Sequence, residues 1–97
     1  MRERRHGPRR PGRELPWTGA RVRPGRDVEV VDFGMGGVLL EGATRLMPGT
    51  HIVLQLRGEG RSVAVGGRVL RCEVVSLDGG TGIRYRGAVG FDAPCEF

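Results

Sequence analysis

Arginine and aspartate residues occur in a pattern that could bind a phosphorylated ligand. Arg5, Arg9 and Arg13 repeat at every fourth position and form two overlapping R-x-x-x-R motifs. A guanidinium group binds phosphate through two parallel hydrogen bonds and also fits the O6 and N7 edge of guanine. Asp32, at the start of a glycine-rich stretch, could accept hydrogen bonds from the other edge of that base. The residues predict a guanine-nucleotide site; the alternative is that the arginines bind anions without specificity.

The positive charge of the chain is concentrated in its first 26 residues. All 16 basic residues are arginine, and nine of them lie in this segment against two acids, so its formal charge is +7 while the rest of the chain carries −2. Residues 1–14 contain too little apolar surface to offset the entropy of ordering, so we expect a mobile arm there. Such an arm favours a phosphate, a nucleic acid or an acidic protein surface as its partner.

Catalytic, metal-binding and membrane-spanning patterns are not found in the sequence. Neither Ser62 nor Ser76 has a histidine at a spacing that suggests a nucleophile and its base, so we expect a protein that is not an enzyme. Cys72 and Cys95 are 23 positions apart with no CxxC pair, which argues against a zinc site or another cofactor. No apolar run suits a signal peptide or a membrane span, so we expect a cytoplasmic protein.

Short segments of alternating polarity predict an all-β domain over residues 15–97. The expected strands cover residues 20–23, 26–30, 38–41, 51–56, 62–75, 83–85 and 88–91. The alternation between Asp27 and Phe33 puts Val28 and Val30 on one face; Asp32 either shares that face or points out of the glycine corner as an acceptor. Glycine-rich turns at intervals of about 10 residues predict a small closed barrel or a sandwich. Closure would also remove the exposed edges of such a small sheet.

Particular residues predict how the core is covered and where the chain bends. Trp17, the only tryptophan, is expected to cover one end of the core. Gly66 and Gly67 interrupt the longest predicted strand, which predicts a bulge or a bend at a barrel corner. Three glycines also follow Asp32 closely, where they could adopt positive φ or let other groups approach the backbone.

The order of these motifs resembles the PilZ domain family. That family has an R-x-x-x-R segment, an extended lead-in, and a D-x-S-x-x-G segment between two strands, and residues 32–37 (Asp-Phe-Gly-Met-Gly-Gly) stand at the second motif here. The similarity continues through residues 45–50, 67–69 and 85–92. The resemblance implies a six-stranded antiparallel β-barrel that acts as a non-enzymatic receptor for the bacterial second messenger cyclic di-GMP.

The resemblance also implies roles for particular residues. Arg5 and Arg9, or Arg9 and Arg13, would hold the phosphates and guanines of the ligand. The residues expected to meet a guanine are Asp32, Gly34 and Gly37. Gly34 replaces the motif serine, and one lost neutral hydrogen bond costs about 0.5–1.5 kcal/mol, which weakens binding without abolishing it.

Several alternatives to this interpretation remain open at the level of sequence. Arg21, Arg23 and Arg26 lie nearer the glycine corner and could supply the positive charge instead. Members of the family that have lost the ligand serve as adaptors, so the chain could bind a protein partner and little or no nucleotide. The scarcity of aromatic residues argues against a nucleic-acid binder that stacks bases.

Overall fold

Seven β-strands make up most of the part of the chain that the structure describes. The computed structural model describes residues 9–12, 17–23, 25–58, 60–76 and 82–95, and none of these forms an α-helix. The strands are β1 (Arg10–Pro11), β2 (Gly19–Val22), β3 (Arg26–Phe33), β4 (Gly37–Gly42), β5 (His51–Gly58), β6 (Arg61–Ser76) and β7 (Arg84–Phe91). The described part of the chain contains no helix with the length and apolarity that crossing a membrane requires.

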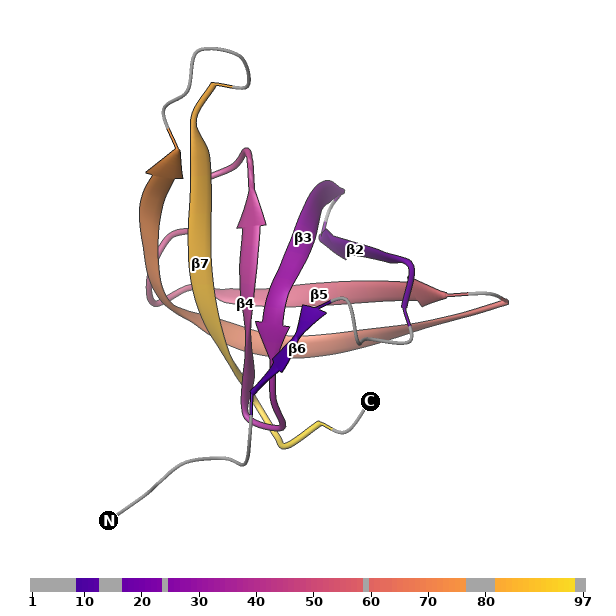
Figure 1. Cartoon of the computed structure of the whole chain (residues 1–97). Coiled ribbons are helices and arrows are strands. Elements are labelled where there is room, and N and C mark those ends of the chain that lie inside the picture. Colours follow the sequence, from indigo (N-terminus) through magenta and orange to yellow (C-terminus); the bar gives the residue numbers. More distant parts are fainter. Residues whose placement is uncertain (1–8, 13–16, 24, 59, 77–81, 96–97) are drawn as a thin grey trace.

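Six of the strands form a closed antiparallel barrel, and β1 pairs with the end of β3 as an additional short strand. Their order is β3-β2-β5-β6-β7-β4, and pairing between β3 and β4 closes the sheet. The longest strand, β6, pairs with β5 in its first half and with β7 in its second half, and it curves between the two (Figure 1). The structure confirms the small six-stranded all-β barrel expected from the sequence. The two segments predicted at 83–85 and 88–91 are one strand, β7.

The core is built from inward-facing side chains of all six barrel strands and one loop leucine. Its buried members are Val22, Phe33, Val38, Leu40, Leu46, Leu54, Leu56, Val69 and Val89. Burying each of these side chains contributes roughly 1.5–3 kcal/mol relative to leaving it exposed. Trp17 is partly buried and packs against this cluster, in agreement with its predicted place at the edge of the core.

The double glycine of β6 lies where this strand changes its pairing partner. Gly67 pairs with Ile52 of β5 and also with Phe91 of β7. A Cβ on Gly67 would lie 2.7 Å from the carbonyl oxygen of Gly90, so the backbone of β7 passes too close for a side chain. The bend expected here therefore coincides with the change of partner, while the irregular pairings of β6 lie further along the strand.

A β-bulge in β3 decides which way Asp32 faces. The pairing of β3 with β4 shifts by one residue between Val30 and Asp32, which leaves Val31 as an extra residue. Unbroken alternation from Val28 and Val30 would direct Asp32 into the barrel. Because of the bulge, Phe33 occupies the inward position with 6% exposure, and the carboxylate of Asp32 lies on the outer face. Of the two orientations that the sequence leaves open for Asp32, the structure shows the outward one.

A second bulge, in β6, has the same effect on an arginine. The pairing of β6 with β7 shifts between Val69 and Arg71, which leaves Leu70 as the extra residue. Val69 is buried in the core, so unbroken alternation would place Arg71 inside as well. Arg71 instead pairs with Ala88 and is exposed on the outer face.

The end of the predicted arm lies against the barrel. Of residues 1–14, the structure describes 9–12, and Arg10 and Pro11 pair with Phe33 and Asp32 of β3 as the short strand β1. A Cβ on Gly12 would lie 1.8 Å from the carbonyl oxygen of Val30, so the chain passes very close to β3. The mobile arm stays a prediction for residues 1–14, and the structure shows that the four described residues of this segment contact the backbone of β3.

Candidate functional site

The glycine corner between β3 and β4 is held by backbone hydrogen bonds from two sides. The amide of Gly34 donates to the carbonyl of Gly37 at 2.9 Å and closes the turn. From outside, the amides of Phe91 and Cys95 donate to two other carbonyls of the corner, each at 2.9 Å. Residues 34–37 are therefore fixed between their own hairpin and the segment that follows β7.

Gly37 is required by close packing, since its φ is not positive. A Cβ at this position would lie 2.4 Å from the carbonyl oxygen of Val89 on β7, a distance that side chains do not tolerate. The absence of a side chain lets β4 and β7 lie close together at this point. Of the two reasons that the sequence offers for glycine here, the structure supports close approach.

Arg9 and Asp32 form an ion pair on the outer face of the barrel, beside the corner. The Nε of Arg9 donates to Oδ1 of Asp32 at 3.0 Å, and Nη2 contacts the same oxygen. The Nη1 of Arg9 also lies 3.5 Å from the carbonyl oxygen of Gly37. The arginine and aspartate side chains are 48% and 31% exposed, so the pair is open to solvent and to a ligand.

A groove of about 670 Å³ extends from this ion pair across the outer face of the barrel. Its lining residues are Arg9, Asp32, Gly36, Gly37, Val38, Leu39, Leu70, Arg71, Ala88, Val89, Gly90, Phe91, Asp92, Ala93 and Pro94. The volume lies within the range of roughly 300–1,000 Å³ that small-molecule sites occupy. Gly37, Ala88 and Gly90 contribute little or no side chain to this lining, and charged residues stand at its sides.

Four residues on neighbouring strands form a row across this groove. Asp32 of β3 pairs with Leu39 of β4, which pairs with Ala88 of β7, which pairs with Arg71 of β6. Adjacent strands lie roughly 4.8 Å apart, so the ends of the row are separated by about 14 Å at the backbone. A carboxylate thus stands at one side of the groove and a guanidinium at the other, with an apolar surface between them.

The segment after β7 forms one end of the groove and is held by a side-chain contact. Nε2 of His51 lies 2.7 Å from Oδ2 of Asp92, and both side chains are about half exposed. Asp92 is further held by its amide, which donates to the carbonyl of Gly66. The sequence predicts a solvent-facing His51, and the structure confirms this position.

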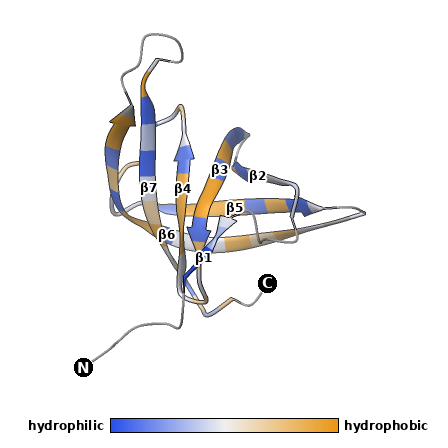
Figure 2. Ribbon diagram, in the orientation of Figure 1, coloured by the Kyte–Doolittle hydropathy of each residue, from blue (hydrophilic) through white to orange (hydrophobic). Residues whose placement is uncertain are grey.

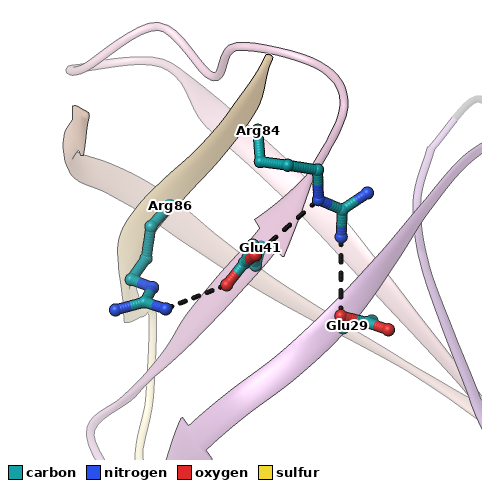
Figure 3. Close-up of polar contacts among 4 residues, drawn as sticks. All are labelled: Glu29, Glu41, Arg84 and Arg86. Atoms are coloured by element: carbon teal, nitrogen blue, oxygen red, sulfur yellow. Dashed lines mark hydrogen bonds and ion pairs between the residues drawn. The ribbon is translucent and has the colours of Figure 1, made fainter. Parts of the chain in front are cut away.

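An ion-pair network lies next to the groove on the same outer face. Figure 3 shows Glu41 of β4 between Arg84 and Arg86 of β7, and Arg84 also reaches Glu29 of β3. Arg86 donates to Glu41 at 2.9 Å, and Arg84 lies 3.6 Å from Glu41 and 3.5 Å from Glu29. The network connects three neighbouring strands and places its arginines on acidic partners. The positive charges of these arginines are therefore already balanced by Glu41 and Glu29.

The structure brings together some of the predicted site residues. Arg9, Asp32 and Gly37 meet at the groove, and Gly34 is buried in the turn beside it. Arg5 and Arg13, which the sequence also predicts for the site, lie outside the described residues. The alternative arginines lie elsewhere, because Arg21 pairs with Asp27 at 3.0 Å and none of Arg21, Arg23 and Arg26 lines the groove.

Sequence reasoning missed the far side of the groove. Leu70 and Arg71 reach it because β6 bulges, and the segment 92–94 reaches it because the corner binds the chain that follows β7. The alternation along β6 carries no local sign of this bulge. The run Gly90-Phe91-Asp92 was part of the family resemblance and is the only signal that pointed to this region.

A second cavity, of about 410 Å³, lies between β2 and β3. Its lining includes Trp17 and Leu56 with Glu29 as the charged member, so it does not suit an anion. Among the described residues, no group of three His, Cys, Asp or Glu side chains is placed to hold a metal ion.

Comparison with known proteins identifies no relative of this chain. No protein-family model matches the chain, and no curated protein or solved structure matches it significantly. Any function must therefore be inferred from the groove itself and from the resemblance of its motifs.

Proposed function

We propose that the chain is a non-enzymatic receptor for cyclic di-GMP, and that the outer-face groove binds the nucleotide. The observation that carries this proposal is the meeting of Arg9, Asp32 and Gly37 at one end of the groove. Arg9 is 23 positions from Asp32 and 28 positions from Gly37 in the sequence. The motif resemblance assigns all three residues to the ligand. The closed barrel is the scaffold that the same resemblance implies.

The carboxylate of Asp32 has the capacity to bind guanine while it stays near Arg9. Both contacts from Arg9 go to Oδ1, and within the described residues Oδ2 has no such contact. Oδ2 could accept hydrogen bonds from the N1 and N2 groups of guanine, and Arg9 could turn to the O6 and N7 edge or to a phosphate. The Arg9–Asp32 pair is solvent-exposed, so rearranging it costs about 1 kcal/mol or less.

The floor of the groove suits the flat face of a base. Leu39 and Ala88 lie between the charged sides, and Leu70 stands beside them. An apolar surface with a few convergent polar groups is typical of small-molecule sites. Gly34 is buried and supplies no hydroxyl group, so we expect weaker binding than a serine at this position would give.

Calorimetric titration of cyclic di-GMP into the intact chain tests the proposal. Hydrogen bonds to charged groups contribute about 1.5–3 kcal/mol, so Arg9→Gln and Asp32→Asn should each weaken binding by roughly ten- to hundredfold. The matched controls are Arg21→Gln and Asp27→Asn, which remove an ion pair of the same Nε–Oδ1 length, 3.0 Å, outside the groove. These controls should bind within about twofold of the intact chain.

The same titration separates a receptor from a nucleic-acid binder. Binding of single-stranded nucleic acid would collapse with salt and would tolerate Asp32→Asn. Equal affinities of Asp32→Asn and Asp27→Asn for cyclic di-GMP would contradict the proposed role of the groove.

One observation favours a second candidate function, an adaptor that binds a protein partner. Leu70, Val74 and Val75 are exposed along the second half of β6, and Figure 2 shows the end of this strand coloured hydrophobic. Exposed apolar side chains gathered on one strand are typical of interaction surfaces. An intact chain that gives no heat with cyclic di-GMP would favour this function over the first.

A further inference from the structure

The side of the groove opposite Asp32 carries a guanidinium that nothing else in the described structure uses. Arg71 is exposed and lines the groove, and its guanidinium has no hydrogen-bonding or ion-pairing partner among the described residues. Arg9 differs, since Asp32 already neutralises it, and so do Arg84 and Arg86, which share Glu41.

Two bulges place Arg71 and Asp32 at opposite ends of one row. In β3 the extra residue turns Asp32 outward, and in β6 the extra residue Leu70 turns Arg71 outward. Without either bulge, the charged side chain after it would point into the apolar core, at a high cost in desolvation. Bulges commonly occur beside functional sites, where they redirect a side chain. Both irregularities therefore serve the same groove.

The β6 bulge also places an apolar side chain next to the guanidinium. A Cβ on Gly90 would lie 3.5 Å from Cδ1 of Leu70, so the leucine side chain lies over this glycine at the groove floor. Leu70 is 62% exposed. An aliphatic surface beside a free cation fits a ligand that is part base and part phosphate, rather than a free inorganic anion.

We propose that Arg71 is a phosphate-binding residue of the groove and that it faces the guanine-binding Asp32 across Leu39 and Ala88. The assignment rests on the proposed cyclic di-GMP function and adds a residue that the motif resemblance does not name. The backbone separation of about 14 Å between the two ends leaves room for a guanine on one side and a phosphate on the other, because the arginine side chain extends several ångströms over the floor.

The test compares four chains by calorimetric titration of cyclic di-GMP: the intact protein, Arg71→Gln, Arg71→Lys and Arg57→Gln. Arg57 is an exposed arginine of β5 that does not line the groove, so its variant removes one charge without touching the site. We expect Arg71→Gln to weaken binding roughly ten- to hundredfold, Arg71→Lys to recover part of the loss, and Arg57→Gln to change binding by about twofold or less.

A measurement on the unmodified chain makes the result independent of how the variants fold. The Nε–H resonance of Arg71 should shift on addition of cyclic di-GMP, while that of Arg57 should stay in place. If the intact chain binds cyclic di-GMP but Arg71→Gln binds as tightly as Arg57→Gln, the assignment is overturned and the proposed function survives. If the intact chain does not bind cyclic di-GMP, the proposed function fails and the assignment fails with it.

Discussion

Replacing Gly37 by alanine tests the packing reason for glycine at the end of the motif. The new Cβ would lie 2.4 Å from the carbonyl oxygen of Val89 and 3.5 Å from the Cα of Gly90. The obstacle is the backbone of β7, which cannot turn aside as a flexible side chain can, so β4 and β7 must separate. Overpacking of this kind costs about 1–3 kcal/mol. For a domain of this size, about 2 kcal/mol corresponds to a fall in Tm of about 8–16 °C.

Gly19→Ala is the matched control for this substitution. Gly19 also lies in a barrel strand, its φ is not positive, and a Cβ there would meet nothing within 4 Å. Alanine at position 19 should be neutral or should stabilise the chain by up to about 1 kcal/mol, because it reduces the entropy of the unfolded state. Urea and thermal unfolding of the full chain measure both effects. If the two variants unfold within about 0.5 kcal/mol of each other, the argument from close approach is refuted.

Three further predictions concern the rest of the described structure. Glu41→Gln leaves its two arginine neighbours without their shared partner and should lower stability to urea by about 1 kcal/mol at low salt and by less in 1 M NaCl. The control Asp27→Asn, at an 81% exposed carboxylate, should change this stability by less than about 0.5 kcal/mol, and equal, salt-independent losses in the two variants would contradict the prediction. Leu40→Ala empties a fully buried core position and should cost about 2–5 kcal/mol in urea unfolding, while Met47→Ala at an exposed position should stay within about 0.5 kcal/mol, and similar losses would refute the assigned core. Burial raises the pKa of the Cys95 thiol, so less thiolate is present at pH 8 in the folded chain than in the unfolded chain. Peptide mass spectrometry should therefore show iodoacetamide modifying Cys95 more slowly in the folded chain than in urea, and equal rates would count against the burial of this thiol.

The sequence alone was sufficient to predict the class of fold. Alternation over short segments and glycine-rich turns predict an all-β barrel, and the six-stranded closed barrel confirms it. This works because strand periodicity and turn chemistry are local properties that each segment carries by itself. Side-chain chemistry named Arg9 and Asp32, and the motif resemblance added Gly37. The structure brings these three residues together, while Arg5 and Arg13 stay predictions.

The sequence could not predict which way the charged residues of the groove face. Alternation alone directs Asp32 and Arg71 inward, and only the pairing of β3 with β4 and of β6 with β7 reveals the extra residues that turn them outward. A bulge is a mismatch in length between two paired strands, so it depends on partners distant in the chain.

Residue types and local spacing therefore determined the strands, the turns, the arginine-rich segment and one half of the candidate site. The tertiary structure decided the groove, its second charged side and the close approach of β4 to β7 at Gly37. The physical reason is that strand register and barrel closure depend on hydrogen bonds between segments that are distant in the sequence, whereas sequence patterns describe each segment separately.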